Sequence, residues 1–162
     1  MRLTAFSDVS LRVLVLLNGL PEGQKLTTQQ LAEGVGSPYH HVTKTVANLA
    51  AMGLVLSARG RSGGVRISDQ GRDASLGGLL RQLEGDQPMV ECESPHGDCP
   101  LDRGCTLRGL LARAREAFYA DLEPVRIRDL ANPRQTGPVM VELGLAPPTS
   151  SFPVSQPQGE AP

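Results

Sequence analysis

Residues 27–53 read TTQQLAEGVGSPYHHVTKTVANLAAMG, and this stretch decides the fold. It opens with the T-x-x-Q pattern of a helical capping box and continues as a short helix up to a GVG turn. Ser37 and Pro38 then predict the start of a second helix, with the serine as its cap and the proline at its first helical position. Two helices joined by a tight glycine turn are typical of a helix-turn-helix.

The flanking sequence completes a small domain around these two helices. Residues 3–18 predict an earlier amphipathic helix, because apolar residues recur there at spacings of three and four. Residues 54–57 and 65–68 form two short β-like runs around the basic, glycine-rich tip ARGRSGG. We expect a β-hairpin there, the wing of a winged helix, so the predicted fold is mainly α with a small β-hairpin.

The rest of the chain divides into two further regions. After a winged helix-turn-helix over residues 1–72, residues 73–131 are expected to hold an amphipathic helix (74–85), a cysteine loop (86–105) and a long helix (106–122) that is a candidate dimerisation helix. Residues 132–162 are rich in Pro, Gly and Ser. We expect this tail to be largely disordered, since it cannot bury enough apolar surface to offset its ordering entropy.

Composition excludes several classes of protein. The chain has no Trp and only three Phe and two Tyr, so its core must be aliphatic. Its longest apolar run, VLVLL at residues 13–17, is far shorter than the roughly 20 residues of a membrane span. The N-terminus does not resemble a signal peptide. We therefore expect a cytoplasmic protein that does not bind membranes.

Charge is unevenly distributed along a chain whose formal net charge is −1. No acidic residue lies between Glu33 and Asp69, and four basic residues give this interval a charge of +4, which leaves −5 for the rest. A polar helix face or a basic turn alone is ordinary solvated surface, but together they indicate double-stranded DNA as the partner. The second helix of such a unit enters the major groove, and wing arginines suit phosphates or the minor groove. The residues expected to contact DNA are Thr28, Ser37, Tyr39, His40, Thr43, Lys44, Arg59, Arg61, Gly63 and Arg66.

All three cysteines fall in one acidic loop with the spacing C-x6-C-x5-C, at Cys92, Cys99 and Cys105. A disulfide is disfavoured in the cytosol, and inert packing is disfavoured by the polar surroundings. Zinc remains open because His96 could complete a Cys3His site, although short C-x2–4-C pairs are missing. The wide spacing favours an iron–sulfur cluster, whose usual ligands are thiolates. Neighbouring carboxylates argue against an activated catalytic cysteine, and no catalytic constellation is found, so the protein is not expected to be an enzyme.

The combination of an N-terminal MRLT, the wing tip ARGRSGG and three cysteines before a long helix resembles the Rrf2 family of bacterial repressors. The resemblance covers roughly residues 1–131. Within the family, CPLDRGCTLRGLLARAREAFYADLEP is most similar to the nitric-oxide-sensing actinobacterial branch. This resemblance implies a homodimer on a palindromic operator, with a 4Fe–4S cluster on each subunit; 2Fe–2S or zinc are the alternatives.

The resemblance also implies the ligands. The three cysteines would bind the cluster together with Asp8 from the partner subunit, and Arg12 would orient that carboxylate. Another branch of the family uses a histidine three residues after the last cysteine, where this chain has Arg108. An ordinary helical ion pair with Arg12, four residues on, is the other explanation of Asp8, and His96 is the rival fourth ligand.

The implied function is repression relieved by nitric oxide. Nitrosylation of the cluster would release DNA and derepress genes of nitric-oxide detoxification. Two alternatives remain: a repressor that senses iron–sulfur supply or redox state, and a zinc-stabilised winged-helix module.

Overall fold

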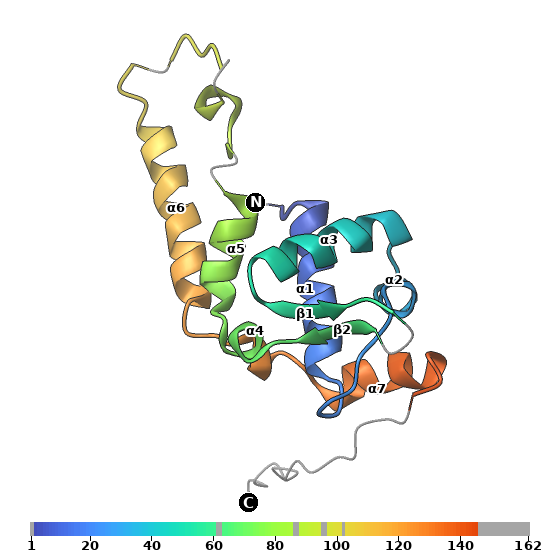
Figure 1. Ribbon diagram of the computed structural model, residues 1–162. Helices are drawn as coiled ribbons and strands as arrows, with labels where there is room; N and C mark the ends of the chain where they lie inside the picture. The colour runs from blue at the N-terminus through green and yellow to red at the C-terminus, as the bar shows by residue number, and fades with distance from the viewer. Residues whose placement is uncertain (1, 61–62, 86–87, 95–96, 102, 146–162) are drawn as a thin grey trace, which may run out of the picture.

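The computed structural model describes residues 2–60, 63–85, 88–94, 97–101 and 103–145, as helices around one two-stranded antiparallel sheet (Figure 1). In chain order the elements are α1 (Ala5–Asn18), α2 (Thr28–Val35), α3 (Tyr39–Ala51), β1 (Val55–Ala58), β2 (Gly64–Ile67), α4 (Asp69–Asp73), α5 (Leu76–Glu84), the 3-10 turn η1 (Glu91–Glu93), α6 (Thr106–Leu122), the 3-10 turn η2 (Ile127–Asp129) and α7 (Pro133–Glu142). The mainly helical fold with a hairpin is as predicted.

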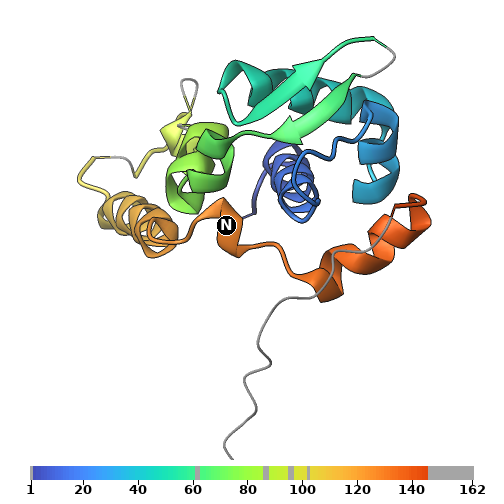
Figure 2. The ribbon, with the colours of Figure 1, turned by 60° about the horizontal axis from the view of Figure 1, so that its bottom comes forward.

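Helix α1 is the centre of the core. Figure 2 shows it enclosed by α2, α3, the hairpin and the chain that follows α6. Val13 and Leu14 are fully buried and Leu17 is 1% exposed, which confirms the apolar face expected from the sequence. Burying each such side chain stabilises the fold by roughly 1.5–3 kcal/mol.

The helix-turn-helix forms as predicted, with one correction at the start of α3. Thr27 and Gln30 make both bonds of the capping box at the start of α2, and Gly36 ends that helix in the left-handed conformation at φ +62°. Ser37, however, does not cap α3: Pro38 occupies the N-cap position, and no side chain caps this terminus. The helix therefore begins one residue later than expected.

The wing is a hairpin attached to the rest of the domain along one edge. Strands β1 and β2 pair antiparallel, with Val55 opposite Ile67. On the other side of β2, the backbone of Leu26 exchanges two hydrogen bonds with Val65, at 3.0 and 2.7 Å. The inward side chains of Val55, Val65 and Ile67 are buried, so the wing is anchored in the core.

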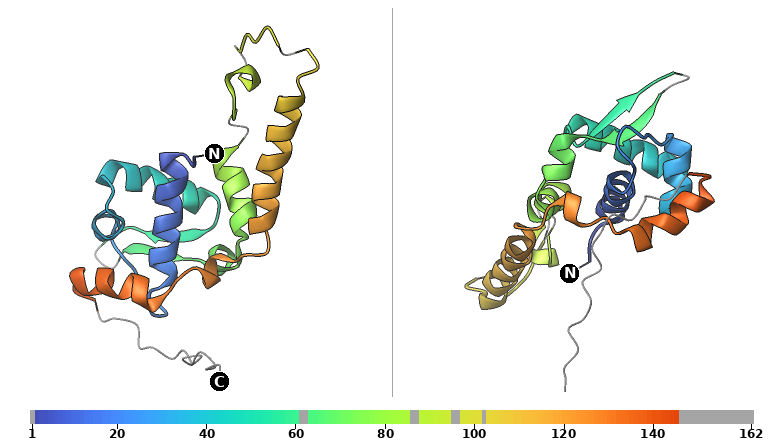
Figure 3. Two further views of the ribbon diagram at one scale, coloured as in Figure 1. Left: turned by 180° about the vertical axis from the view of Figure 1, so that it is seen from behind. Right: turned by 90° about the horizontal axis from the view of Figure 1, so that it is seen from below.

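Helices α5 and α6 form a separate pair at one side of the winged helix, seen from behind in Figure 3. They pack very closely at Gly77, where a Cβ atom would lie 2.2 Å from the carbonyl oxygen of Tyr119. Tyr119 itself is only 4% exposed. Two leucines of α6 face away from this contact: Leu107 is 59% and Leu110 49% exposed.

The prediction of a largely disordered tail from residue 132 is wrong for its first part. Asn132 caps α7 by accepting a hydrogen bond from the backbone N–H of Arg134 at 2.9 Å. Thr136 and Met140 are buried beside α1 and α2, and Thr136 packs against Gly19. Residues 146–162 lie outside the described residues.

Candidate nucleic-acid interface and cysteine loop

Helix α3 is the second helix of the helix-turn-helix, and therefore the predicted recognition helix; it presents a polar face opposite its buried one. Val42 and Leu49 point inward and are fully buried, whereas Tyr39 is 54% exposed. The other exposed side chains on its first turns are His40, His41, Thr43 and Lys44. The two histidine rings lie edge to face with centroids 4.3 Å apart, and the Thr43 hydroxyl donates to the carbonyl oxygen of Tyr39 at 2.9 Å. Of the remaining predicted contacts, Ser37 and Thr28 are half-buried at the ends of the two helices.

The wing adds cationic side chains beside this helix. Arg59 and Arg66 are exposed, on the residue after β1 and on β2, and Arg61 lies outside the described residues. Gly63 has a structural reason of its own, because a Cβ atom there would lie 2.4 Å from the carbonyl oxygen of Ala58. The glycine is needed for the hairpin to close, whether or not DNA approaches it.

The side chain of Ser68 adds hydrogen bonds that join the wing to the end of α3. The Ser68 hydroxyl donates to the carbonyl oxygen of Gly53 at 2.6 Å and accepts from the N–H of Gly71 at 2.9 Å. It thereby ties the residue after β2 to the end of α3 and caps α4. Gly71 packs so closely that a Cβ atom would lie 2.1 Å from the Leu54 carbonyl oxygen.

The three cysteines are free and half-buried, at different places in one loop. Cys92 lies in η1 and Cys105 is the N-cap of α6, where it makes no capping hydrogen bond. Cys99 lies between them, and His96 is outside the described residues. Within the described part of the chain, no three His, Cys, Asp or Glu side chains are close enough together to hold one metal ion.

The donor set nevertheless suits an iron–sulfur cluster. Three thiols that form no disulfide are available on one loop. Cys105 stands at the N-terminus of α6, the positive end of the helix dipole. The loop would have to draw its cysteines together around the cluster.

Sequence reasoning missed the ion pair that anchors this loop. The carboxylate of Glu93, 11% exposed, lies 3.7 Å from the guanidinium of Arg115 on α6. The same carboxylate accepts a hydrogen bond from the N–H of Met89 at 2.9 Å. The pair fixes η1, and with it Cys92, against the middle of α6.

Asp8 forms an ion pair with Arg12 within the same helix. One carboxylate oxygen lies 2.6 Å from Arg12 Nη2 and the other accepts from Nε at 3.1 Å. The arginine also donates to the carbonyl oxygen of Val35 on α2 at 3.4 Å. The expected ion pair is thus present, and the Asp8 side chain remains 48% exposed and accessible to a second subunit.

A second unpredicted carboxylate joins the cysteine region to α1. Glu84, the last residue of α5, is 8% exposed and accepts from the N–H of Thr4 at 3.0 Å. Thr4 is the N-cap of α1, and Asp8 lies one turn further along. The only sequence signal is a carboxylate at the end of an amphipathic helix, which does not identify its partner.

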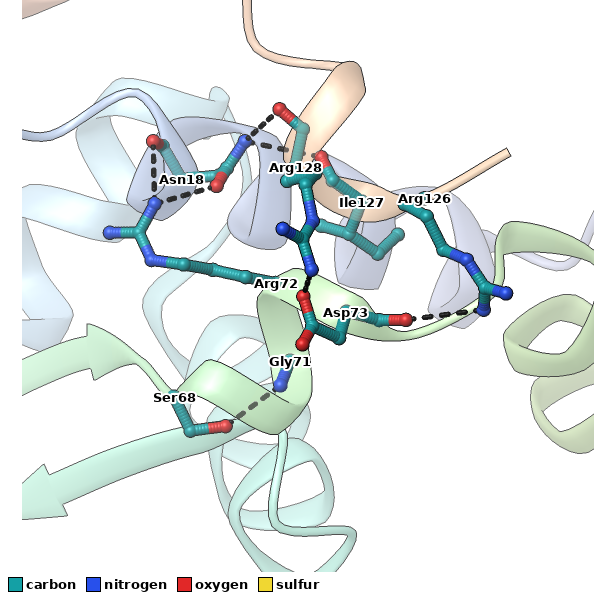
Figure 4. Close-up of polar contacts among 8 residues, drawn as sticks. All are labelled: Asn18, Ser68, Gly71, Arg72, Asp73, Arg126, Ile127 and Arg128. Atoms are coloured by element: carbon teal, nitrogen blue, oxygen red, sulfur yellow. Dashed lines mark hydrogen bonds and ion pairs between the residues drawn. The ribbon is translucent and has the colours of Figure 1, made fainter. Parts of the chain in front are cut away.

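A polar cluster connects the segment after α6 to the winged helix (Figure 4). The side-chain nitrogen of Asn18 donates to the carbonyl oxygens of Ile127 and Arg128 at 3.1 and 3.0 Å. Its oxygen accepts from Arg72 on α4 at 2.9 Å. Arg128 also forms an ion pair with Asp73. The cluster therefore links α1, α4 and η2 at one point.

The pKa of Tyr119 is raised above its ordinary value of 10.0, first by burial and then by the negative charge of Glu84. Arg81 opposes this, with its guanidinium 5.0 Å from the centre of the tyrosine ring. The phenol therefore stays neutral in the α5–α6 contact.

The helices within the described ranges include none that is both long and apolar enough to span a membrane.

Comparison with known proteins gives the family. The model of the Rrf2 family, described as an iron-dependent transcriptional regulator, matches residues 3–133. The HTH-type transcriptional repressor NsrR of Streptomyces coelicolor is 44% identical over 144 residues, which cover 88% of this chain and 96% of that protein. The HTH-type transcriptional regulator NsrR of Geobacillus kaustophilus is 34% identical over 135 residues, 83% of this chain and 92% of that one.

Solved structures agree on the fold. Staphylococcus aureus CymR has a TM-score of 0.61 at 22% identity, with 80% of this chain and 97% of that chain covered. T. potens IscR also has a TM-score of 0.61, at 18% identity, with 80% and 85% covered. The chain thus belongs to the Rrf2 family of transcriptional regulators, and it is a DNA-binding regulator rather than an enzyme.

Proposed function

We propose that the protein is a homodimeric repressor in which Cys92, Cys99 and Cys105 hold an iron–sulfur cluster, and that nitric oxide is the signal that ends repression. One observation carries the proposal: three free thiols lie on the loop before α6 in a chain 44% identical to an NsrR repressor. We propose a 4Fe–4S cluster on each subunit, with Asp8 of the partner subunit as the fourth ligand. The place of action is the cytoplasm, where promoter DNA lies.

The exposed surface of α6 supports the homodimer. Leu107, Leu110 and Phe118 are 59%, 49% and 36% exposed, and their spacing places them on one stripe of the helix. Joining two copies through these stripes would remove them from water. A two-fold dimer would present two copies of α3 to two half-sites, so its operator would be palindromic.

The proposed mechanism depends on α1 as the link between loop and DNA. When bound, a cluster would supply iron that reacts with nitric oxide, most readily at a position held by a carboxylate rather than a thiolate. Asp8 would hold α1 to the partner's loop, and Arg12 would orient the carboxylate while contacting α2 through Val35. Loss of that tie would release α1 and the helix-turn-helix packed on it, which lowers DNA affinity.

The test begins with protein purified without oxygen. Iron, sulfide and zinc are counted on one sample, and about four irons and four sulfides per chain are expected. Anisotropy then follows binding to a duplex selected from random sequence, before and after addition of nitric oxide. The cluster-loaded protein is expected to bind tightly and to release DNA on treatment.

Substitutions test whether Asp8 is a cluster ligand. Asp8→Ala should lose iron to a chelator faster than the wild type, whereas Asp129→Ala, an exposed carboxylate in η2, should not. Equal operator affinity of the cluster-free and cluster-loaded proteins would contradict the mechanism. One zinc per chain and a colourless sample would contradict the cluster, leave a zinc-stabilised module and make His96 the candidate fourth ligand.

A second candidate function has one observation in its favour. The family model that matches this chain is described as iron-dependent. The protein would then sense iron–sulfur supply or redox state. Release of DNA on iron chelation or oxidation, with no response of the loaded protein to nitric oxide, would favour this function.

A further inference from the structure

A pocket of about 270 Å³ lies between the first half of α1 and the recognition helix. Its apolar wall is formed by Ala5, Phe6 and Val9 of α1, and α3 contributes Thr45, His41 and Lys44. The volume is smaller than the 300–1,000 Å³ of typical ligand sites, so it suits one large side chain better than a cofactor. A group bound there would touch both the helix that carries Asp8 and the helix that reads DNA.

One residue of the pocket wall has a polar atom without a hydrogen-bond partner. The hydroxyl of Thr45 is buried and has no hydrogen-bond partner among the described residues, and the residue is 1% exposed. Buried hydroxyls are almost always hydrogen-bonded, and leaving one unpaired costs free energy. Because this hydroxyl is buried and not on the accessible surface, the wall of the pocket stays mainly apolar, which suits an apolar side chain.

The rim of the pocket is basic. His41 and Lys44 are exposed, and they belong to the interval from Glu33 to Asp69 that contains no acidic residue. Asp8 lies on the adjacent helix but is paired with Arg12. An occupant should therefore combine an apolar side chain with nearby carboxylates.

The cysteine loop carries such a combination. Leu101 is 77% exposed, more than any other large hydrophobic side chain in the described part of the chain. Asp98, three residues before it, is also exposed, and the sequence places Asp102 directly after it. The described parts of the loop, residues 88–94 and 97–101, stand beyond the ends of α5 and α6, apart from α3 of the same chain in two opposite views (Figures 1 and 3).

We infer that Leu101 of the partner subunit inserts into the pocket between α1 and α3, with the partner's Asp98 meeting His41 and Lys44 at the rim. The inference rests on the proposed homodimer and adds a contact that needs no cluster ligand. It connects each cysteine loop directly to the recognition helix of the other subunit. A change in the loop then alters α3 itself as well as α1.

The absence of tryptophan from the chain allows a clean test. Phe6→Trp places one tryptophan in the pocket wall, and its emission is measured in the cluster-loaded homodimer. We expect emission at short wavelength and slow quenching by acrylamide. Adding Leu101→Ser should shift the emission to longer wavelength and speed the quenching. Val141→Ser, which removes an apolar side chain 61% exposed on α7, should change neither.

Heterodimers made from two differently tagged chains identify which subunit supplies the leucine. With tryptophan on one chain and Leu101→Ser on the other, the red shift should appear. With both changes on the same chain and a wild-type partner, it should not. The opposite pattern would mean docking within one chain, and no response in either would mean that Leu101 does not enter the pocket; both overturn the inference. If Phe6→Trp does not fold, Ala5→Trp provides the same reporter from an exposed position.

DNA binding distinguishes this inference from the proposed function. Leu101→Ser should keep its iron and sulfide but bind the operator about tenfold more weakly, a coupling of ordinary size. A tryptophan that responds in dimers without any cluster would leave the docking intact and remove the proposed function. An intact cluster and intact operator binding, with no tryptophan response, would leave the proposed function standing and overturn the docking of Leu101.

Discussion

The carboxylate of Glu84 accepts two hydrogen bonds from Thr4, one from its backbone N–H at 3.0 Å and one from its hydroxyl at 3.2 Å. These bonds cross the chain from the end of α5 to the N-cap of α1. The cysteine loop begins two residues after Glu84, and Asp8 lies on the first turn of α1. The contact therefore fixes where the loop leaves the core relative to a proposed cluster ligand.

Removing this carboxylate should destabilise the protein. Glu84→Ala leaves the N–H of Thr4 without its partner in a nearly buried place, which costs about 1–3 kcal/mol. Glu84→Gln keeps one acceptor oxygen and should cost less. Urea unfolding measures both, with Glu22→Gln at an exposed position as the control. Equal stability of wild type and Glu84→Ala would show that the bonds contribute nothing.

Two adjacent glycines in α5 should respond in opposite directions to alanine. Gly77→Ala puts a Cβ atom 2.2 Å from a backbone oxygen of α6, so the helices must separate at a cost of about 1–3 kcal/mol. At Gly78 the nearest atom would lie at 3.5 Å, and alanine should stabilise the helix by up to about 1 kcal/mol. Thermal unfolding of the two variants, which differ only in the position of the new alanine, tests the close packing of α5 against α6. A Gly77→Ala protein as stable as Gly78→Ala would contradict it.

Asn18→Asp should loosen the polar cluster of Figure 4. The aspartate can still accept from Arg72 but cannot donate to the carbonyl oxygens of Ile127 and Arg128. We expect a loss of about 1–3 kcal/mol in the free energy of unfolding and faster amide hydrogen exchange around η2. Asn48→Asp, exposed on α3, is the matched control. Unchanged exchange at η2 would mean that Asn18 does not hold this segment.

Tyr119 predicts an alkaline limit to stability. Its folded-state pKa lies above the ordinary 10.0, so the folded protein holds the phenolic proton more tightly than the unfolded chain. The stability from this proton is complete below the unfolded pKa and is lost as pH rises from there through the folded pKa. In a Tyr39→Phe background, near-ultraviolet absorbance reports the ionisation of Tyr119 alone. Tyr119→Phe should remove its part of the pH dependence, and a slope unchanged by that substitution would refute the assignment.

Substitution of Arg66 tests whether the wing contacts DNA phosphates. If its exposed side chain contacts phosphate, Arg66→Ala should weaken binding to all duplexes similarly and reduce the salt slope by about 1. Arg61→Ala should do the same. Arg134→Ala, exposed on α7, should leave the slope as it is. A wing variant with the wild-type slope would mean that the side chain faces water.

Local sequence determined the helix-turn-helix. The capping box, the glycine turn and the apolar spacing of α3 act over one or two helical turns, so they can be read from the chain directly. The bounds of α6 were likewise predicted, because Pro124 and the flanking loop delimit it. The sequence did not indicate which residue of α6 packs against α5; the close approach at Gly77 buries Tyr119 there.

Helix α7 shows the opposite case. Its sequence, with Gly137 and Pro138 inside it, has poor helix propensity. Burial of Thr136 and Met140 beside α1 and α2 compensates for this. Such packing depends on small residues far away in the chain, Gly19 and Gly34, which no local pattern connects to α7.

The same division holds for the functional regions. The sequence by itself determined the three thiols, the basic interval and the winged helix, because donor chemistry, charge and helical period are properties of the residues and their spacing. Only the tertiary structure decided that Glu84 meets Thr4, that Glu93 meets Arg115, and that α1 and α3 enclose a pocket. These contacts join distant segments, and their partners are selected by the packing of the whole core, which no stretch of sequence contains.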